Sequence, residues 1–193
     1  MKERNGNPMQ HPDIDIRFDA VHPPLPGDHT LAIRPPRLLE VGAMLALFAD
    51  EVRAGKMLPR DPQSVREHID NWLVAVEGSE VVGCVSLVPY NKELCELRSL
   101  AVHPDRRGRG LGSALIRAAI ELARQRGMGR VLALTRAVPL FEKAGFRRDF
   151  VANFPEKVWR DCAPCPFKEA CDEVALIYYL GPPGRKSGNG RGI

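Results

Sequence analysis

The sequence lacks several features, and each absence narrows the class of protein. No segment approaches the roughly 18 consecutive apolar residues that a membrane-spanning helix needs. The first ten residues, MKERNGNPMQ, lack the apolar stretch of a signal peptide, so we expect a cytoplasmic protein with no membrane partner. The five cysteines are an odd number, which argues against a disulfide framework in that compartment.

Clusters of basic residues are also scarce. The net charge of the 193 residues is +4 at pH 7, and residues 182–193 carry three bases and no acid. The rest of the chain has little excess positive charge, whereas a nucleic-acid groove needs Lys and Arg gathered on one face. We therefore expect no nucleic-acid partner. Apolar residues make up 44% and charged residues 27% of the chain, which is typical of one soluble globular domain.

Composition divides the chain into three parts. Residues 1–28 hold five prolines and little periodicity, which predicts a flexible N-terminal arm. Residues 182–193 are mostly Gly, Pro and Arg, which predicts a disordered basic tail. Residues 29–181 should form the folded domain.

Within that domain the hydrophobic period alternates between helix and strand. Asp61 and Pro62 are typical of a helix N-cap and first turn, and the Gly78-Ser79 pair separates two β-rich runs as in a hairpin. The expected helices begin at Pro36 and Pro62 and cover residues 112–126 and 138–143; the expected strands cover residues 30–34, 72–76, 81–88, 95–102, 130–135, 146–150 and 174–180. Helices followed by a meander and strand–helix–strand units predict a mixed α/β (α+β) sheet.

Three glycines at alternate positions precede the long helix: Gly108, Gly110 and Gly112. They let the backbone approach a ligand closely, while the helix presents free N–H groups and the positive end of its dipole. Three arginines in the same segment add positive charge, so the loop is a candidate phosphate site. It is not a Walker A loop, because no Lys-Ser/Thr pair follows the last glycine. An ordinary turn with solvated arginines is the alternative.

The strand expected over residues 95–102 changes phase in its middle. Its apolar residues lie on one face up to Leu97 and on the other face from Leu100. A β-bulge near Arg98-Ser99 is the simplest account, with an irregular strand end as the alternative. Unpaired N–H groups at such a bulge could bind an acyl carbonyl oxygen next to the phosphate loop.

The segment from Glu96 to Gly112 resembles the acetyl-coenzyme A binding core of the GNAT acetyltransferase superfamily, whose motif Gln/Arg-x-x-Gly-x-Gly/Ala is met here. FEKAGF at 141–146 is similar to the superfamily's second signature. The resemblance implies a mostly antiparallel, splayed sheet with flanking helices and a bulged strand, and acetyl-coenzyme A as the cosubstrate. Homodimers are frequent in the superfamily. The residues expected to contact the cosubstrate are Leu100, Ala101, Val102, Arg107, Gly108, Arg109, Gly110, Leu111, Gly112, Ser113 and Phe141.

Within the superfamily the chain most resembles short bacterial N-acetylglutamate synthases. The shared features are ELxxLAV at 96–102, Thr135-Arg136, and KVWRDCxxCP at 157–166. That resemblance implies acetylation of the α-amine of glutamate or glutamine, the first step of arginine biosynthesis. Larger members carry an amino-acid-kinase-like domain, for which this chain has no room, so we expect no arginine feedback. The alternatives are acetylation of a protein N-terminus or another small amine, and a sensor that binds acetyl-coenzyme A without catalysis.

The resemblance places a general base at Glu96, where a buried carboxylate could take the proton of the attacking amine. From the sequence alone, a solvated or arginine-bound strand Glu is the simpler interpretation. Phe141 replaces the tyrosine that often protonates the leaving thiolate in the superfamily. The thiolate would then leave with help from solvent or from Tyr90, Tyr178 or Tyr179.

A dicarboxylate acceptor needs at least two cationic donors, preferably arginines. We expect Arg98, close to Glu96, and Arg136, after a strand that should open on the cleft, to bind the acceptor. Each could instead be a solvated surface arginine. The other candidates are Arg148, Lys157 and Arg160.

Three cysteines, Cys162, Cys165 and Cys171, include the Cys-x-x-Cys spacing of a metal site. A closed zinc site needs four ligands, and no fourth is evident, so we expect no metal. Three cysteines packed in an irregular loop are the alternative.

Overall fold

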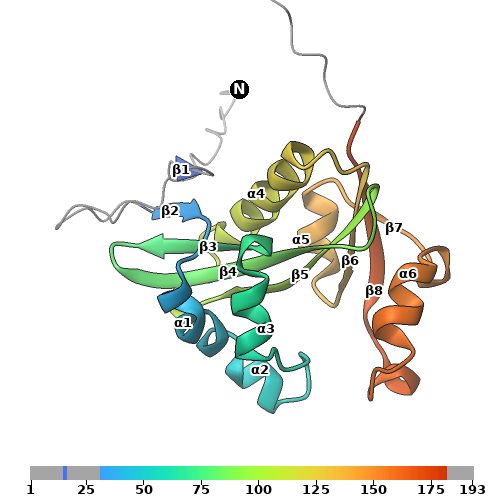
Figure 1. Ribbon diagram of the computed structural model, residues 1–193, viewed down its shortest axis with the longest axis horizontal. Helices are drawn as coiled ribbons and strands as arrows, with labels where there is room; N and C mark the ends of the chain where they lie inside the picture. The colour runs from blue at the N-terminus through green and yellow to red at the C-terminus, as the bar shows by residue number, and fades with distance from the viewer. Residues whose placement is uncertain (1–14, 17–30, 182–193) are drawn as a thin grey trace, which may run out of the picture.

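The computed structural model of the chain describes residues 15–16 and 31–181. The tail expected over residues 182–193, and all but two residues of the arm expected over residues 1–28, lie outside the described residues. The described part is a single twisted sheet with helices on both faces (Figure 1).

The sheet of the described residues has eight strands in the order β1-β2-β3-β4-β5-β6-β8-β7. The pairs β1–β2 and β5–β6 are parallel, and all other neighbouring strands are antiparallel. The predicted mixed, mostly antiparallel sheet is therefore confirmed. The strands are β1 (Asp15–Ile16), β2 (Leu31–Arg34), β3 (Trp72–Glu77), β4 (Glu80–Pro89), β5 (Leu94–Val102), β6 (Arg130–Thr135), β7 (Arg147–Arg148) and β8 (Val174–Tyr179).

Helices cover both faces because the central strands are apolar on both sides. In β3, Leu73 and Ala75 pack with the α4 and α5 side chains, whereas Val74 and Val76 pack with α1. Alternation with period two sends successive side chains to opposite faces. The helices are α1 (Val41–Ala46), α2 (Ala49–Arg53), α3 (Pro62–Glu67), α4 (Leu111–Gln125), α5 (Val138–Lys143) and α6 (Pro155–Lys157), the last continued by a π-helical turn over Val158–Cys162. Across residues 31–181, no helix has the length and apolarity that crossing a membrane requires.

The ends of two helices follow their sequence signals. Asp61 accepts a hydrogen bond from the Ser64 amide at 2.7 Å, as predicted for the N-cap of α3. Gly110 precedes α4 with φ 82°, and Gly127 follows it with φ 70°. A side chain in this left-handed region costs about 1–2 kcal/mol, so glycine is favoured at both ends of the helix.

Two expected elements are shorter in the structure. The strand expected over residues 146–150 is reduced to Arg147–Arg148, because it lies at the sheet edge and turns away where the Phe150 side chain is 78% exposed. The helix expected from Pro36 is divided into a 3₁₀ turn, α1 and α2, because the backbone of Phe48 leaves helical geometry with φ −121°.

The parallel pair β5–β6 is the feature that positions the site. Leu94 to Glu96 pair with Arg130 to Leu132, and the two strands form no further residue pairs. Beyond this point β5 continues along β4 to Val102, while β6 continues along β8 to Thr135. The two strands therefore separate, and the opening between them leads to the loop before α4.

Candidate active site

A cavity of about 1070 Å³ lies where β5 and β6 separate. Its walls include β5, the loop before α4, the end of β6, α5, residues 55–58, Arg60, Lys157 and Glu173. All the residues expected to contact the cosubstrate line this one cavity, together with Glu96, Arg98, Arg136 and Lys157, whereas the acceptor candidates Arg148 and Arg160 do not. These residues come together because β5 and β6 separate, which leaves the edges of both strands and the loop before α4 facing the cavity.

The glycine-rich loop is shaped to hold an anion. Gly108 and Gly110 have φ of 77° and 82°, and a Cβ added to Gly108 would meet nothing within 4 Å. The first turn of the 15-residue α4 follows directly, so its unpaired N–H groups face the same loop. Of the three arginines, Arg106 is tied to Glu77 at 2.6 Å, whereas Arg107 and Arg109 are exposed at the cavity wall.

The predicted bulge is present in β5. Cys84 pairs with Ala101 and Ser86 pairs with Arg98, so one residue of β4 faces two residues of β5. Ser99 has φ 54°, the only positive φ outside glycine among the described residues. The bulge takes the Ser99–Leu100 backbone out of the β4 ladder at the cavity wall.

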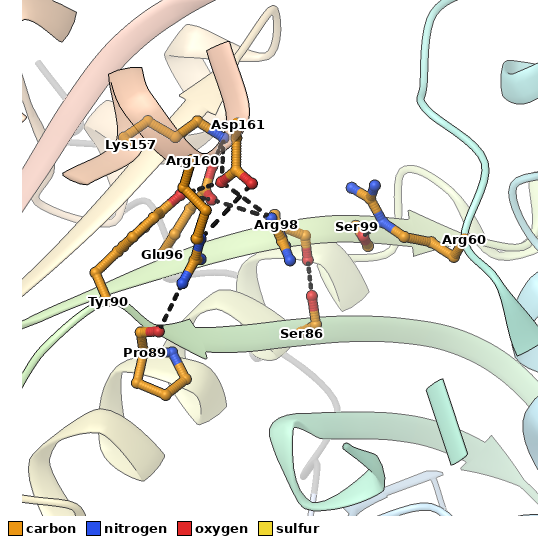
Figure 2. Close-up of polar contacts among 10 residues, drawn as sticks. All are labelled: Arg60, Ser86, Pro89, Tyr90, Glu96, Arg98, Ser99, Lys157, Arg160 and Asp161. Atoms are coloured by element: carbon orange, nitrogen blue, oxygen red, sulfur yellow. Dashed lines mark hydrogen bonds and ion pairs between the residues drawn. The ribbon is translucent and has the colours of Figure 1, made fainter. Parts of the chain in front are cut away.

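Glu96 is a buried carboxylate at the cavity edge, with 2% of its side chain exposed. Lys157 Nζ lies 2.8 Å from its Oε1, and the Tyr90 hydroxyl lies 2.7 Å from its Oε2 (Figure 2). Arg98 lies farther away, with 3.6 Å between its NH1 and Oε2. Glu96 is thus not a solvated strand residue; it is held by donors from three separate segments.

A second carboxylate, Asp161, shares these partners. Its Oδ2 lies 2.5 Å from the Tyr90 hydroxyl, 3.3 Å from Arg98 NH1 and 3.5 Å from Lys157 Nζ. Arg160 Nε lies 3.7 Å from Oδ1. Burial raises the pKa of Asp161, but the Tyr90 hydrogen bond and the nearby cations outweigh it, so the pKa lies below its usual value. We refer to Tyr90, Glu96, Arg98, Lys157 and Asp161 as the polar network.

Two arginines expected to bind the acceptor are already paired. Arg98 contacts both carboxylates of the polar network. Arg136 Nε lies 2.6 Å from Asp172 Oδ1, and its NH1 donates to the Lys56 carbonyl at 2.8 Å and lies 3.6 Å from Glu173 Oε1. Both side chains line the cavity, but neither is a free cation.

Arg60 differs from these two arginines. Its Nε donates to Ser99 Oγ at 3.0 Å, and it forms no ion pair with any described residue. Burial, and then the positive charge of Arg98, lower the pKa of the Arg60 guanidinium. An anion bound between these two cations would relieve both effects. The loop over residues 54–61 has no periodic pattern, so sequence reasoning missed Arg60.

The remaining candidates lie elsewhere. Tyr178 packs on the ring of Phe146, Tyr179 is exposed, and neither lines the cavity. Arg148 pairs with Glu142 on the exposed surface. The described residues contain no group of three or more potential metal ligands, although Cys165 and Cys171 line the cavity as free thiols.

Comparison with known proteins gives one family match. The acetyltransferase (GNAT) family matches residues 43–146. An uncharacterized N-acetyltransferase of Chlorobaculum tepidum is 34% identical over 148 residues, which are 77% of this chain and 96% of that protein. An amino-acid acetyltransferase of Pasteurella multocida is 27% identical over 141 residues, but this chain spans only 32% of its length.

Solved structures have the same fold. Rv2747 of Mycobacterium tuberculosis, in complex with CoA and NLQ, aligns with a TM-score of 0.65 and 25% identity over 77% of this chain and 98% of its own. N-acetylglutamate synthase of Neisseria gonorrhoeae, complexed with coenzyme A and N-acetyl-glutamate, aligns with a TM-score of 0.70 and 24% identity. That alignment covers 78% of this chain and 35% of the synthase, and it shows the shared fold.

Proposed function

Because this chain belongs to the acetyltransferase (GNAT) family, we propose that it transfers the acetyl group of acetyl-coenzyme A to the α-amine of an amino acid, glutamate or glutamine. The observation that carries the proposal is the position of Glu96, a buried carboxylate between the anion-binding loop and a group of cations in one cavity. The proposed reaction is the first step of arginine biosynthesis. Relatives of this chain that are named amino-acid acetyltransferase support the proposal.

The cavity fits acetyl-coenzyme A at the loop end. A side chain at Gly108 or Gly110 would be strained by the positive φ of these residues. The space beside Gly108 is empty within 4 Å of an added Cβ, so a phosphate could approach the backbone there. Arg107 and Arg109 supply positive charge beside it. The bulged backbone at Ser99–Leu100 would hold the pantetheine arm and the acyl oxygen, and the bound thioester supplies the electrophilic carbonyl.

Glu96 would remove the proton from the acceptor amine. Its Oε2 accepts a hydrogen bond from Tyr90 and its Oε1 is paired with the Lys157 ammonium, yet each carboxylate oxygen has a further lone pair that a substrate N–H or a water could use. Phe141 is buried and packs edge-on against Phe146 at 5.2 Å, so no acid is available at its position. Solvent would therefore protonate the leaving thiolate.

Two cavity arginines, Arg60 and Arg109, have no acidic partner among the described residues. Arg109 belongs to the glycine-rich loop, so Arg60 is the best candidate to bind the acceptor's α-carboxylate. Arg98 lies beside it and would assist. A second carboxylate, as in glutamate, would have to compete with Asp172 and Glu173 for Arg136, whereas the amide of glutamine would not. This arrangement favours glutamine over glutamate as the acceptor.

The test is mass-spectrometric detection of acetylated product from acetyl-coenzyme A and a panel of free amino acids. We expect product with glutamine or glutamate, and a loss of about 100-fold or more in kcat for Glu96→Gln. Arg66→Ala, an exposed change on α3, is the control. Turnover only with peptides would move the proposal to protein N-termini, and tight acetyl-coenzyme A binding without any turnover would favour a sensor.

A further inference from the structure

A buried general base needs a route by which its proton can leave. Glu96 is 2% exposed, and its accessible side faces the cavity that both substrates would fill. A proton taken from the amine would be trapped there until the products depart, unless another path reaches solvent. The polar network contains such a path, through the two of its members that do not line the cavity, Tyr90 and Asp161.

The path runs through a single tyrosine hydroxyl. The Tyr90 oxygen lies 2.7 Å from Glu96 Oε2 and 2.5 Å from Asp161 Oδ2 (Figure 2). A phenol carries one proton, so it can donate to only one of the two carboxylates at a time. The other carboxylate is then within hydrogen-bond reach of the phenol oxygen and can donate to it when it is protonated.

The far end of the path lies outside the cavity. Neither Tyr90 nor Asp161 lines the cavity, whereas Glu96 does. Tyr90 instead borders a separate, open depression formed by residues 89–93 and 126–128, and the Asp161 side chain is 24% exposed. The three oxygen-bearing groups therefore connect the cavity with a partly exposed carboxylate that does not line it.

We propose that Tyr90 and Asp161 form a proton exit for Glu96, an inference that rests on the proposed role of Glu96 as the base. The amine proton moves to Glu96. The protonated Glu96 then donates that proton to the Tyr90 oxygen while Tyr90 passes its own proton to Asp161, and Asp161 releases a proton to water. One proton enters and one leaves, and all three groups return to their starting state.

The two transfers at Tyr90 must occur together. Burial, and then the negative charge of Glu96, raise the pKa of the Tyr90 phenol, so a free tyrosinate would be strongly disfavoured. Asp161, by contrast, has a lowered pKa and gives up its proton readily at neutral pH. The other charged and titratable groups near Tyr90, Glu96 and Asp161 are Arg60, Arg98, Lys157, Arg160, Cys162 and Glu173.

Arg160 fixes the tyrosine in this position. Its guanidinium carbon lies 3.7 Å from the centre of the Tyr90 ring, and its NH1 donates to the Pro89 carbonyl at 3.1 Å. The stacked cation restrains the ring. Tyr90, Asp161 and Arg160 act through Glu96 and are positioning residues, not groups that touch the substrates.

The experiment compares steady-state kinetics of Tyr90→Phe and Asp161→Asn with those of Glu96→Gln, using the full chain and the acceptor found in the product assay. We expect Tyr90→Phe and Asp161→Asn each to lower kcat by about tenfold, a part of what general-base catalysis contributes, with KM unchanged. A small buffer base such as imidazole should restore kcat of Tyr90→Phe in proportion to its concentration. The solvent deuterium isotope effect on kcat should also rise, because proton release becomes slower.

The outcomes separate this inference from the proposed function. Loss of activity in Glu96→Gln with full activity in Tyr90→Phe would overturn the exit path and leave the base in place. Full activity in Glu96→Gln would overturn the base itself. A drop in Tyr90→Phe without buffer rescue or a changed isotope effect would show a structural role only and would also overturn the path. Tyr179→Phe, an exposed tyrosine outside the cavity, and the exposed Asp70→Asn are the matched controls.

Discussion

Arg60 donates its Nε hydrogen to Ser99 Oγ at 3.0 Å and thereby joins the loop before α3 to the bulge of β5. The bond uses one edge of the guanidinium and leaves its two terminal nitrogens without a hydrogen-bond partner among the described residues. The cosubstrate should contact the bulge, and the acceptor should contact Arg60. The hydrogen bond therefore restrains the position of the acceptor-binding arginine relative to the cosubstrate-binding backbone.

The first prediction concerns this arginine. Arg60→Ala should raise KM for the amino-acid acceptor by about 10-fold to 100-fold, because a charge-assisted contact to the carboxylate is lost, while KM for acetyl-coenzyme A changes little. Arg60→Lys should recover only part of the loss, since an ammonium lacks the planar fork. Initial rates with each substrate varied in turn give both constants. Equal effects on the two KM values would contradict the assignment.

The second prediction compares two glycines at opposite ends of α4. Gly110→Ala and Gly127→Ala should each lower the free energy of unfolding by about 1 kcal/mol, because both residues have positive φ. Only Gly110→Ala should weaken binding of coenzyme A, measured by titration calorimetry, since Gly127 lies away from the cavity. If both variants bind coenzyme A as tightly as the parent, the loop is not the phosphate site.

The third prediction concerns the buried ion pair. Lys157→Met should lower the free energy of unfolding by about 3 kcal/mol, because it removes the nearest cation of the buried Glu96 carboxylate and leaves only Arg98, at 3.6 Å. Adding Glu96→Gln to that variant should recover part of the loss. Urea denaturation measures both, and the exposed Lys168→Met is the control. A double variant whose loss equals the sum of the losses in Lys157→Met alone and Glu96→Gln alone would show that the two side chains are not coupled.

The fourth prediction uses pH. Burial raises the pKa of Glu40, but hydrogen bonds from Arg34 and the Arg37 backbone outweigh it, so the folded pKa lies below its usual value of 4.5. The unfolded chain then binds the proton first as pH falls. This part of the stability is complete above about pH 4.5 and is lost as the pH falls through the folded pKa.

Glu40→Gln should accordingly be less stable than the parent at neutral pH, and the gap should narrow toward acid. Urea denaturation between neutral and acid pH measures the gap, with Glu121→Gln as an exposed, paired control. A gap that stays constant across this range would exclude ionisation of Glu40 as its cause.

Local signals predicted much of the fold. Asp61 before Pro62, the Gly78-Ser79 turn and the glycines around α4 each act through a few neighbouring residues, and the structure has the element that each one indicates. The bulge in β5 could also be predicted, because a slip in alternation is itself local. Element boundaries differ from the prediction where contacts distant in sequence decide them, as at the edge strand β7.

The polar network could not be predicted in the same way. Arg98 and Asp161 are 63 positions apart, and Tyr90 and Asp161 are 71 positions apart. Nothing in the sequence shows which acid a distant arginine will meet. For the same reason Arg136, expected to bind the acceptor, is held by Asp172 and Glu173. Arg60, which the sequence did not single out, has no acidic partner among the described residues.

The separation of β5 from β6 has an evolutionary consequence. The end of the cavity that should face the thioester donor is made largely of backbone, from the bulge and the glycine-rich loop, and therefore depends little on side-chain identity. The end that should face the acceptor is built from side chains of separate segments, including Arg60, Arg136, Lys157 and Glu173. Substitutions at those positions can change which amine is accepted while donor recognition stays intact, so one scaffold can acquire new acceptors by small steps.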